Sequence, residues 1–214
     1  MDKLKAKIVI DRLAERFPDA KPELKYSSPF ELLVAVILSA QCTDKRVNMV
    51  TSELFKEYNT PQAMIKLNEQ QLGAKIRSCG FYNMKAKHIL STCHDIITRF
   101  NGEVPSTLEE LQTLDGVGRK TANVVYAVAF GGNAIAVDTH VFRVSNRIGL
   151  ACAKTPLETE KQLNAILDEN IWSKAHHYLI FHGRNICKSQ KPKCFACPIA
   201  NLCENKPNDK QIQN

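Results

Sequence analysis

The sequence predicts an all-α protein whose helices are joined by short loops. Apolar residues recur at helical spacing in most segments, and at Ser28–Pro29 and Thr155–Pro156 a capping residue precedes proline at the first helical position. Sustained apolar–polar alternation, the signal of a half-buried strand, occurs nowhere in the sequence, and no hairpin dipeptide stands between apolar runs.

Length and charge bound the class of protein. The 214 residues suffice for one large domain or two small ones, and 29 basic against 22 acidic side chains give a net charge of +7. This charge suits a polyanionic partner, although many proteins without one are equally basic. The most apolar run, residues 32–40, is too short to cross a membrane, and the first residues lack the apolar core of a secretory signal. We therefore expect a cytoplasmic protein with no membrane partner.

The first half of the chain should form a first helix, a linker, a core helix and several further helices, one of which is long. Apolar spacing predicts a helix over 4–17, and the polar, proline-containing stretch 18–27 predicts a linker. The next helix should start at a capping box of Ser28 and Glu31 and, being apolar nearly all round to Ala40, should lie centrally in a core. Further helices are expected over 44–58, from 61, over 69–78, over 83–100 and from 107, with Thr43 or Asp44, Thr60 and Asn68 as caps.

The second half should hold four more helices, the last of which leads the chain into a group of cysteines. An aspartate before a helix is most often a cap, so capping is the first interpretation of Asp138 and a catalytic role is the alternative. The expected ranges are 121–130, 139–150 capped by Asp138, a helix from 156 with a capping box of Thr155 and Glu158, and 174–186 started by Ser173.

Residues 114–121 (Leu-Asp-Gly-Val-Gly-Arg-Lys-Thr) form a glycine-containing turn between two helices. Gly116 and Gly118 let the backbone turn sharply and approach a ligand with no side chain in the way. The next helix presents its positive end there, and Arg119 and Lys120 add charge, so the turn favours an anion such as a nucleic-acid phosphate. It is not a Walker A loop, because Arg119 rather than glycine precedes the lysine. A plain corner between helices, with a solvated lysine, remains the alternative.

Four of the eight cysteines lie near the C-terminus at intervals of six, two and five residues. They are Cys187, Cys194, Cys197 and Cys203. Four thiolates are the ligand set of both zinc and [4Fe–4S] sites. A single close pair flanked by longer arms favours the larger cluster; zinc is the alternative, and disulfides are least favoured in a reducing cytosol. The remaining cysteines are expected to be small buried hydrophobes: Cys42, Cys79, Cys93 and Cys152.

The six-residue interval between the first two clustered cysteines is basic, because it contains Lys188, Lys191 and Lys193. One interpretation is a solvated charged loop. The other is a basic finger, held in place by the metal cluster, that contacts phosphates of a nucleic acid.

Taken together, these motifs resemble the endonuclease III family of DNA base-excision glycosylases. The segments that carry the resemblance are 28–33, 38–44, 101–105, 114–122, 137–144 and the four cysteines at 6-2-5 intervals. The combination is specific, although no single motif is, and it covers nearly the whole chain. Two residues depart from the family pattern: Asp115 stands where proline is usual, and Cys42 where alanine is frequent. Asp115 places a negative charge beside a loop expected to face phosphate.

The resemblance implies a two-domain helix-hairpin-helix glycosylase fold with a C-terminal [4Fe–4S] cluster loop. Residues 22–132 would form the central helical domain, and residues 1–21 with 133–214 the iron–sulfur cluster domain. Double-stranded DNA with a damaged pyrimidine or an abasic site would lie in the groove between them. The protein is expected to be a monomer associated with the nucleoid.

The same resemblance implies a bifunctional enzyme that removes oxidised pyrimidines and then cleaves the strand 3′ of the abasic site. Lys120 would attack C1′ of a flipped nucleotide with help from Asp138, and partial burial would disfavour the charged form of the lysine. Gln41 would fill the vacated space, and the cluster would serve structure. Further DNA contacts are expected from Gly116, Gly118, Arg119, His140, Lys191 and Lys193.

Two other functions remain open at this point. A monofunctional adenine-mismatch glycosylase would resemble this chain in hairpin and cysteines, but it would lack Lys120 and carry a further C-terminal domain, whereas only 11 residues follow Cys203. A non-catalytic DNA-binding or redox module would need neither Lys120 nor Asp138.

Overall fold

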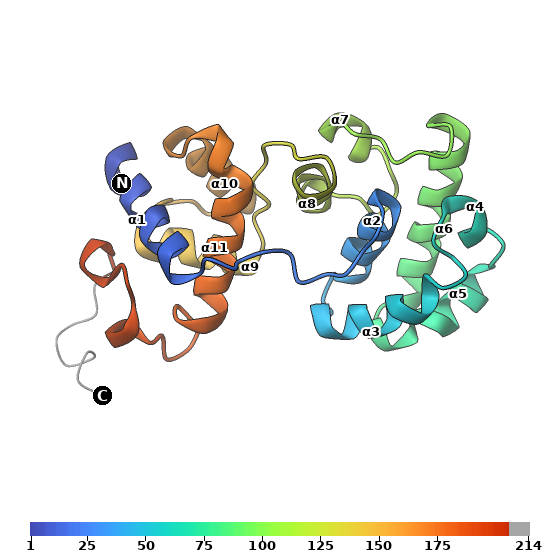
Figure 1. The fold of residues 1–214 in the computed structure, drawn as a ribbon, viewed down its shortest axis with the longest axis horizontal. Coiled ribbons are helices and arrows are strands. Elements are labelled where there is room, and N and C mark those ends of the chain that lie inside the picture. The colour runs from blue at the N-terminus through green and yellow to red at the C-terminus, as the bar shows by residue number, and fades with distance from the viewer. Residues whose placement is uncertain (206–214) are drawn as a thin grey trace. The chain divides into compact units, whose positions relative to one another are not determined.

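The computed structural model describes residues 1–205, and every regular element in that range is a helix (Figure 1). The all-α prediction is therefore confirmed. The α-helices are α1 (Lys3–Arg16), α2 (Pro29–Leu38), α3 (Asp44–Leu54), α4 (Pro61–Met64), α5 (Glu69–Ile76), α6 (Tyr82–Arg99), α7 (Leu108–Leu111), α8 (Arg119–Ala129), α9 (Thr139–Ile148), α10 (Pro156–Ile166) and α11 (Trp172–Asn185). The 3₁₀ helices are η1 (Arg77–Cys79), η2 (Glu169–Ile171), η3 (Cys194–Ala196) and η4 (Ala200–Leu202). None of the described helices is long and apolar enough to span a bilayer.

The chain divides into two compact units, each with its own apolar core. The middle unit is Pro22–Gly132, and the terminal unit joins Met1–Lys21 to Asn133–Asn214. The core of the middle unit is centred on α2, in which every residue from Phe30 to Leu38 is buried, and α6 and α8 pack against it. A helix that is apolar on all sides can be covered only by surrounding it with other helices, so the predicted core helix is confirmed.

Side-chain caps start most helices of the middle unit. Thr43, rather than Asp44, caps α3 by accepting a hydrogen bond from a first-turn amide. At α2, Ser28 accepts from the amide of Glu31, as expected. The Glu31 carboxylate, however, accepts from the amide of Ser27 at 2.6 Å, so the predicted capping box reaches one residue further back along the chain.

The terminal unit is built around α11, against which α1 and α9 pack. Asp138 caps α9, and Thr155 and Glu158 form a reciprocal capping box at α10, so both predicted helix starts are confirmed. The predicted start of the last helix is wrong, because α11 already begins at Trp172 with no side-chain cap. The 3₁₀ turn of η2 runs directly into α11, which leaves Ser173 inside the helix.

Burial of the scattered cysteines was predicted correctly for two of the four. Cys79 and Cys93 are buried, whereas Cys42 is half-buried and Cys152 is exposed. Cys152 lies in the loop after α9, where its amide donates to the side chain of Gln162 at 2.7 Å. Apolar sequence neighbours indicate burial only inside a periodic helix, and this loop lies beyond the end of that pattern.

Candidate nucleic-acid and catalytic site

The turn between α7 and α8 is a hairpin fixed to the core of the middle unit. Leu114 and Val117 are buried in that core, so the turn is anchored on both sides of its apex. Gly116 lies between them with a φ of +72°, and a Cβ at this position would come within 2.7 Å of the Cβ of His88. Only glycine combines this left-handed backbone with such close packing.

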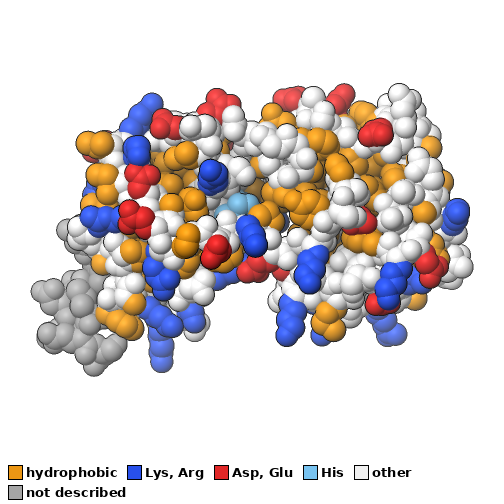
Figure 2. All heavy atoms as spheres, viewed as in Figure 1, with side chains coloured by type: hydrophobic (Ala, Val, Ile, Leu, Met, Phe, Trp, Pro, Cys, Tyr) orange, Lys and Arg blue, Asp and Glu red, His pale blue; other side chains and the backbone are white. Residues whose placement is uncertain are grey.

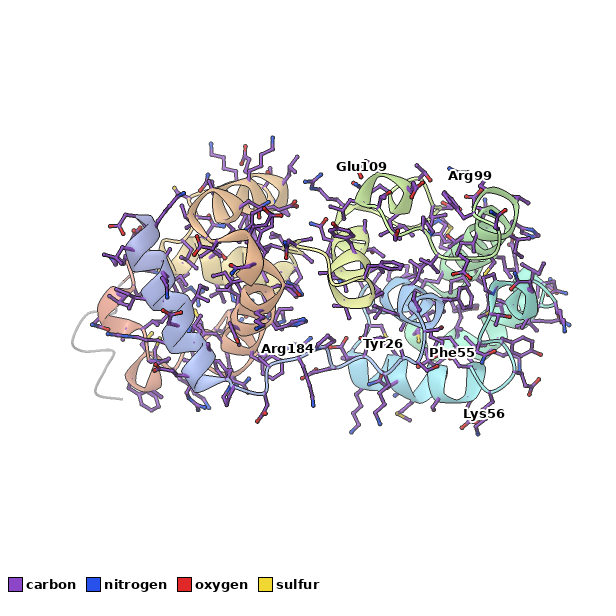
Figure 3. All side chains as sticks on the ribbon, turned by 45° about the horizontal axis from the view of Figure 1, so that its top comes forward. Tyr26, Phe55, Lys56, Arg99, Glu109 and Arg184 are labelled. Carbon is purple, nitrogen blue, oxygen red and sulfur yellow. The ribbon has the colours of Figure 1, made fainter. Side chains whose placement is uncertain are left out.

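Side chains of α6 donate hydrogen bonds to the hairpin and to the residue that precedes it. Thr92 Oγ1 donates to the carbonyl oxygen of Asp115 at 2.7 Å, and Arg99 donates to Thr113 Oγ1 at 2.8 Å. Arg99 lies at the end of α6, where Figure 3 labels it. The carboxylate of Asp115 lies 3.8 Å from Nε2 of His88. The negative charge that departs from the family pattern therefore has an imidazole beside it within the protein itself.

Gly118, where α8 begins, is open to its surroundings. Its φ of −79° and ψ of 174° are extended angles that any residue adopts, and a Cβ there would meet no atom within 4 Å. The described fold therefore does not itself require glycine at this position, whereas close approach of a phosphate to the backbone would favour it. Because α8 starts without a capping side chain, its positive end suits an anion.

Arg119 and Lys120 occupy the first turn of α8, and both side chains are exposed. The helix thus begins two residues earlier than the predicted start at Thr121, which places both cations at its positive end. The expected partial burial of Lys120 is wrong for the protein alone. The positive end of α8 and the neighbouring Arg119 both oppose a positive charge at this place.

Gln41 lies in the turn between α2 and α3, exposed and with a left-handed backbone at φ +53°. Non-glycine residues in this conformation are uncommon, and such strain is concentrated at functional sites. Its side-chain amide has no hydrogen-bond partner among the described residues. α3 begins just beyond with exposed Lys45 and Arg46, and Figure 2 shows basic side chains projecting from the edge formed by this helix.

Phe81 is a candidate site residue that sequence reasoning missed. It stands before α6 with a left-handed backbone at φ +47°, and 65% of its surface is exposed. A bulky residue in this conformation is a true outlier, and such a backbone persists only where its surroundings enforce it. The available signal was an aromatic residue directly after Gly80, the residue that follows η1.

Asp138 and His140 lie at the start of α9 in the terminal unit. The carboxylate of Asp138 accepts a hydrogen bond from the amide of Val141 at 2.7 Å, so the capping role is confirmed. His140 is half-buried, and its Nδ1 lies 3.2 Å from Nη2 of Arg143. Burial lowers the pKa of His140, and although Asp138 opposes that shift, the cation of Arg143 adds to it. His140 therefore favours the neutral form.

The four clustered cysteines line one pocket of the terminal unit. They are Cys187 after α11, Cys194 and Cys197 around η3, and Cys203 after η4, and Arg147 and His182 line the same pocket. Burial raises the pKa of Cys197 to about 11 and also raises the pKa values of the Cys194 and Cys203 thiols. Among residues 1–205 no three His, Cys, Asp or Glu side chains are grouped so as to hold a single metal ion.

His182 lies between the core of the terminal unit and this pocket. Its Nε2 lies 3.8 Å from the sulfur of Cys197, while its Nδ1 is buried with no hydrogen-bond partner among the described residues. Burial lowers the pKa of His182 to about 4, so the imidazole is neutral. A neutral ring beside a cysteine sulfur can donate a single N–H to that sulfur.

Arginines of α9 hold the basic loop that follows Cys187. Arg143 donates to the carbonyl of Cys187 at 3.1 Å, and Arg147 donates to the carbonyl of Lys188 at 2.6 Å. Nη1 of Arg147 also lies 3.6 Å from the sulfur of Cys187. The loop closes where the amide of Lys193 donates to the carbonyl of Ile186. The lysines themselves are exposed, so the loop presents cations while its backbone is fixed.

Comparisons with known proteins decide the family. Residues 34–169 match the HhH-GPD superfamily of base excision DNA repair proteins. The chain is 49% identical to endonuclease III of Haemophilus influenzae over 206 residues, which cover 96% of this chain and 98% of that protein. The chain belongs to the endonuclease III family. It is therefore a base-excision DNA repair enzyme of the class of glycosylases with abasic-site lyase activity.

Solved structures agree with this assignment. A non-covalent endonuclease III–DNA complex superposes with a TM-score of 0.93 at 47% identity and covers the whole of both chains. A trapped endonuclease III–DNA covalent intermediate superposes with a TM-score of 0.92 at 49% identity, covering 96% of this chain and 97% of that one. The predicted helix-hairpin-helix glycosylase fold is thus confirmed.

Within this endonuclease III fold, each unit assembles part of the predicted site. The middle unit carries Lys120 on the hairpin and, on a separate turn, Gln41. The terminal unit carries Asp138 and His140 on α9, together with the four cysteines and the basic loop. The two residues predicted to perform the chemistry, Lys120 and Asp138, therefore come from different units.

Proposed function

We propose that this endonuclease III-family protein removes oxidised pyrimidines from double-stranded DNA and then cleaves the strand 3′ of the resulting abasic site. The observation that carries the proposal is the position of Lys120. Its exposed amine lies in the first turn of α8, two residues after a glycine that the fold itself does not require. A phosphate bound at that helix start would place the sugar of a neighbouring nucleotide within reach of the amine.

Binding of the DNA backbone would be shared by the two units, which we propose are the central helical domain and the cluster domain. Backbone amides near Gly116 and Gly118, together with Arg119, would bind phosphate from the hairpin. Lys191 and Lys193 in the fixed loop, and His140 at the start of α9, would bind it from the cluster domain. The net charge of +7 favours association with DNA, and we place the enzyme with the nucleoid DNA of the cytoplasm.

A glycosylase reaches the sugar carbon of a stacked nucleotide only after the nucleotide leaves the helix. Gln41 is suited to fill the vacated space, because its exposed amide can donate and accept hydrogen bonds at once. The exposed ring of Phe81 is suited to stack on, or wedge between, neighbouring bases. Oxidised pyrimidines stack and pair poorly, so they are the least costly to extrude.

The chemistry follows from a neutral amine at Lys120. Its Nζ forms a bond to C1′ while the C1′–N bond to the base breaks, and the base departs with that electron pair and is protonated. The C1′–O4′ bond of the sugar ring then breaks, a proton lost from Nζ is taken up by O4′, and the Nζ–C1′ bond becomes a protonated Schiff base. This cation acidifies the C2′ proton, whose loss breaks the C3′–O bond and releases the 3′ phosphate. Hydrolysis of the remaining Schiff base frees Lys120.

Asp138 is the proposed partner of Lys120. Its carboxylate can accept a proton from the lysine ammonium, or stabilise the positive charge that develops on the sugar as the base departs. One carboxylate oxygen is already occupied by the amide of Val141, which fixes the orientation of the group. A carboxylate held by its own helix start needs little reorganisation during the reaction.

The cysteine pocket fits a [4Fe–4S] cluster, which we propose is held by Cys187, Cys194, Cys197 and Cys203. The pocket is lined by four thiols and by two cationic residues, Arg147 and Lys193, and an anionic iron–thiolate cluster matches that combination. When bound, the cluster would supply covalent anchoring of the loop; base excision transfers no net electrons. The purified protein is expected to contain four irons per chain and to show visible iron–thiolate absorbance. Stoichiometric zinc without iron would contradict the assignment.

The function is tested by trapping the Schiff base. The wild-type protein is incubated with duplex DNA that contains thymine glycol or an abasic site, and borohydride is added to reduce the imine. We expect a covalent adduct with the wild type and with Lys66→Gln, an exposed lysine of the same unit that lies in α4's following turn. Lys120→Gln should form no adduct. If the wild type binds DNA but forms no adduct, the proposed Schiff-base mechanism is overturned.

A further inference from the structure

Lys85 is a buried lysine whose side chain the proposed reaction does not use. Only 5% of its surface is exposed, although it is a charged residue on a core-facing side of α6. Its Nζ donates to three backbone carbonyls, those of Leu38 at 2.8 Å, Ala40 at 2.7 Å and Cys79 at 2.8 Å. No carboxylate pairs with it among the residues that the structure describes.

An ammonium in this position is chemically specialised. It has three N–H donors, and the three carbonyls accept all of them, so the charge is satisfied by dipoles alone. Burial lowers the pKa of Lys85, which shows that the site opposes the charge. An apolar side chain would remove that opposition but would leave three buried carbonyl oxygens without a donor. The lysine therefore suits this position because it donates a hydrogen bond to each of the three carbonyls.

Those carbonyls belong to two turns that are far apart in sequence. Leu38 ends α2, where helix carbonyls lack partners and the dipole favours a cation, and Ala40 lies two residues further on in the following turn. Cys79 ends η1. Lys85 thus ties both chain segments to α6 through a single atom.

Each of these turns leads directly into a strained, exposed residue. Gln41 follows Ala40 with a φ of +53°, and Phe81 follows Cys79 by two residues with a φ of +47°. Left-handed backbone at a side-chain-bearing residue persists only where the surroundings enforce it. The Lys85 ammonium binds the carbonyl of Ala40, immediately before Gln41, and the carbonyl of Cys79, two residues before Phe81.

We propose that Lys85 is a positioning residue for nucleotide extrusion, which fixes the Gln41 turn and the Phe81 turn relative to each other. This inference rests on the proposed function of Gln41 in filling the space left by the flipped nucleotide. A damaged base must be extruded from the stack before Lys120 can attack. A preformed abasic site has no base to extrude, so reaction there depends much less on the two turns.

The test is a double-mutant cycle between Lys85 and Gln41, read on two substrates in single-turnover reactions. Lys85→Met keeps the length of the side chain and removes its charge. We expect it to slow release of thymine glycol from duplex DNA about tenfold or more, while strand cleavage at a preformed abasic site changes less than about threefold. Gln41→Ala should likewise slow base release much more than cleavage at the abasic site. The double variant should be no slower than the slower single variant.

Two controls separate positioning from general destabilisation. Lys66→Met removes an exposed lysine of the same unit and should match the wild type on both substrates. Ile96→Val weakens the buried core of α6 away from the turns and should lower stability without the substrate split. If Lys85→Met does not fold, Lys85→Arg keeps charge and donors in a different geometry and must show the same split and the same lack of additivity.

The role of Lys85 would be overturned if Lys85→Met slowed both reactions equally. It would also be overturned if the fold-reduction in rate of the double variant equalled the product of the fold-reductions of the two single variants. Both outcomes presuppose that the wild type forms a borohydride-trapped adduct at the abasic site. Absence of that adduct would instead contradict the proposed function, so the two failures are distinguishable.

Discussion

A single side chain can serve both the fold and the proposed reaction, and Asp138 is the example in this protein. Its carboxylate caps α9, a role that the sequence pattern predicts and the structure confirms. Its proposed role as partner of Lys120 is independent of the cap, because capping needs an oxygen acceptor and the chemistry needs a charge. The two roles can therefore be separated by substitution.

Asp138→Asn keeps an oxygen that can cap α9 and removes the charge. We expect its free energy of unfolding to stay within about 0.5 kcal/mol of the wild type, while base release slows about a hundredfold or more. Asp138→Ala should lose the rate and, in addition, about 1 kcal/mol of stability. Denaturant unfolding and single-turnover base release measure both quantities. A fully active Asp138→Asn would leave the residue as a cap alone.

In the hairpin between α7 and α8, glycine is favoured at two positions for different physical reasons. Gly116 is required by the fold, because its backbone is left-handed and His88 packs against it. Gly118 has ordinary angles and open space around it. The sequence shows both glycines and predicts an anion-binding turn, but it cannot distinguish their roles, since the contact with His88 comes from a different helix.

The two glycines predict opposite outcomes for alanine substitution. Gly116→Ala should lower the free energy of unfolding by about 1–3 kcal/mol, because it adds backbone strain and a clash. Gly118→Ala should leave stability within about 0.5 kcal/mol and weaken binding to abasic-site duplex about tenfold, the loss of one charge-assisted hydrogen bond. Thermal unfolding and fluorescence anisotropy test the pair. An unchanged DNA affinity of Gly118→Ala would contradict the proposed phosphate contact at this residue.

At the scale of the whole molecule, local patterns predicted the helices, while contacts between distant elements escaped prediction. The caps at Ser28, Asn68, Asp138 and Thr155 depend only on residues close together in the sequence, so periodicity and capping rules predict them. Lys85 looks in sequence like one of several lysines on a helix. Its three carbonyl partners come from segments that only the packed fold brings together. Likewise, the exposure of Lys120 follows from packing rather than from its neighbours.

Acid sensitivity of the terminal unit follows from the histidines of α11. Burial lowers the pKa of His177 from 6.5 to about 4. The unfolded chain therefore takes up a proton below pH 6.5 that the folded protein resists, so this stabilising contribution is complete above pH 6.5 and is lost as the pH falls towards 4. His177→Gln should flatten the pH dependence of unfolding by up to about 3 kcal/mol between pH 7 and 4. A variant with the wild-type pH dependence would contradict this assignment.

The central claim is that Lys120 forms the covalent bond to DNA, and mapping the trapped adduct tests it most directly. The wild-type protein is reduced with borohydride on abasic-site duplex, digested with a protease, and analysed by mass spectrometry for the peptide that carries the sugar remnant. We expect the remnant to be attached to Nζ of Lys120 and to no other amine. Attachment to another lysine or to the N-terminal amine, with Lys120 unmodified, would contradict it.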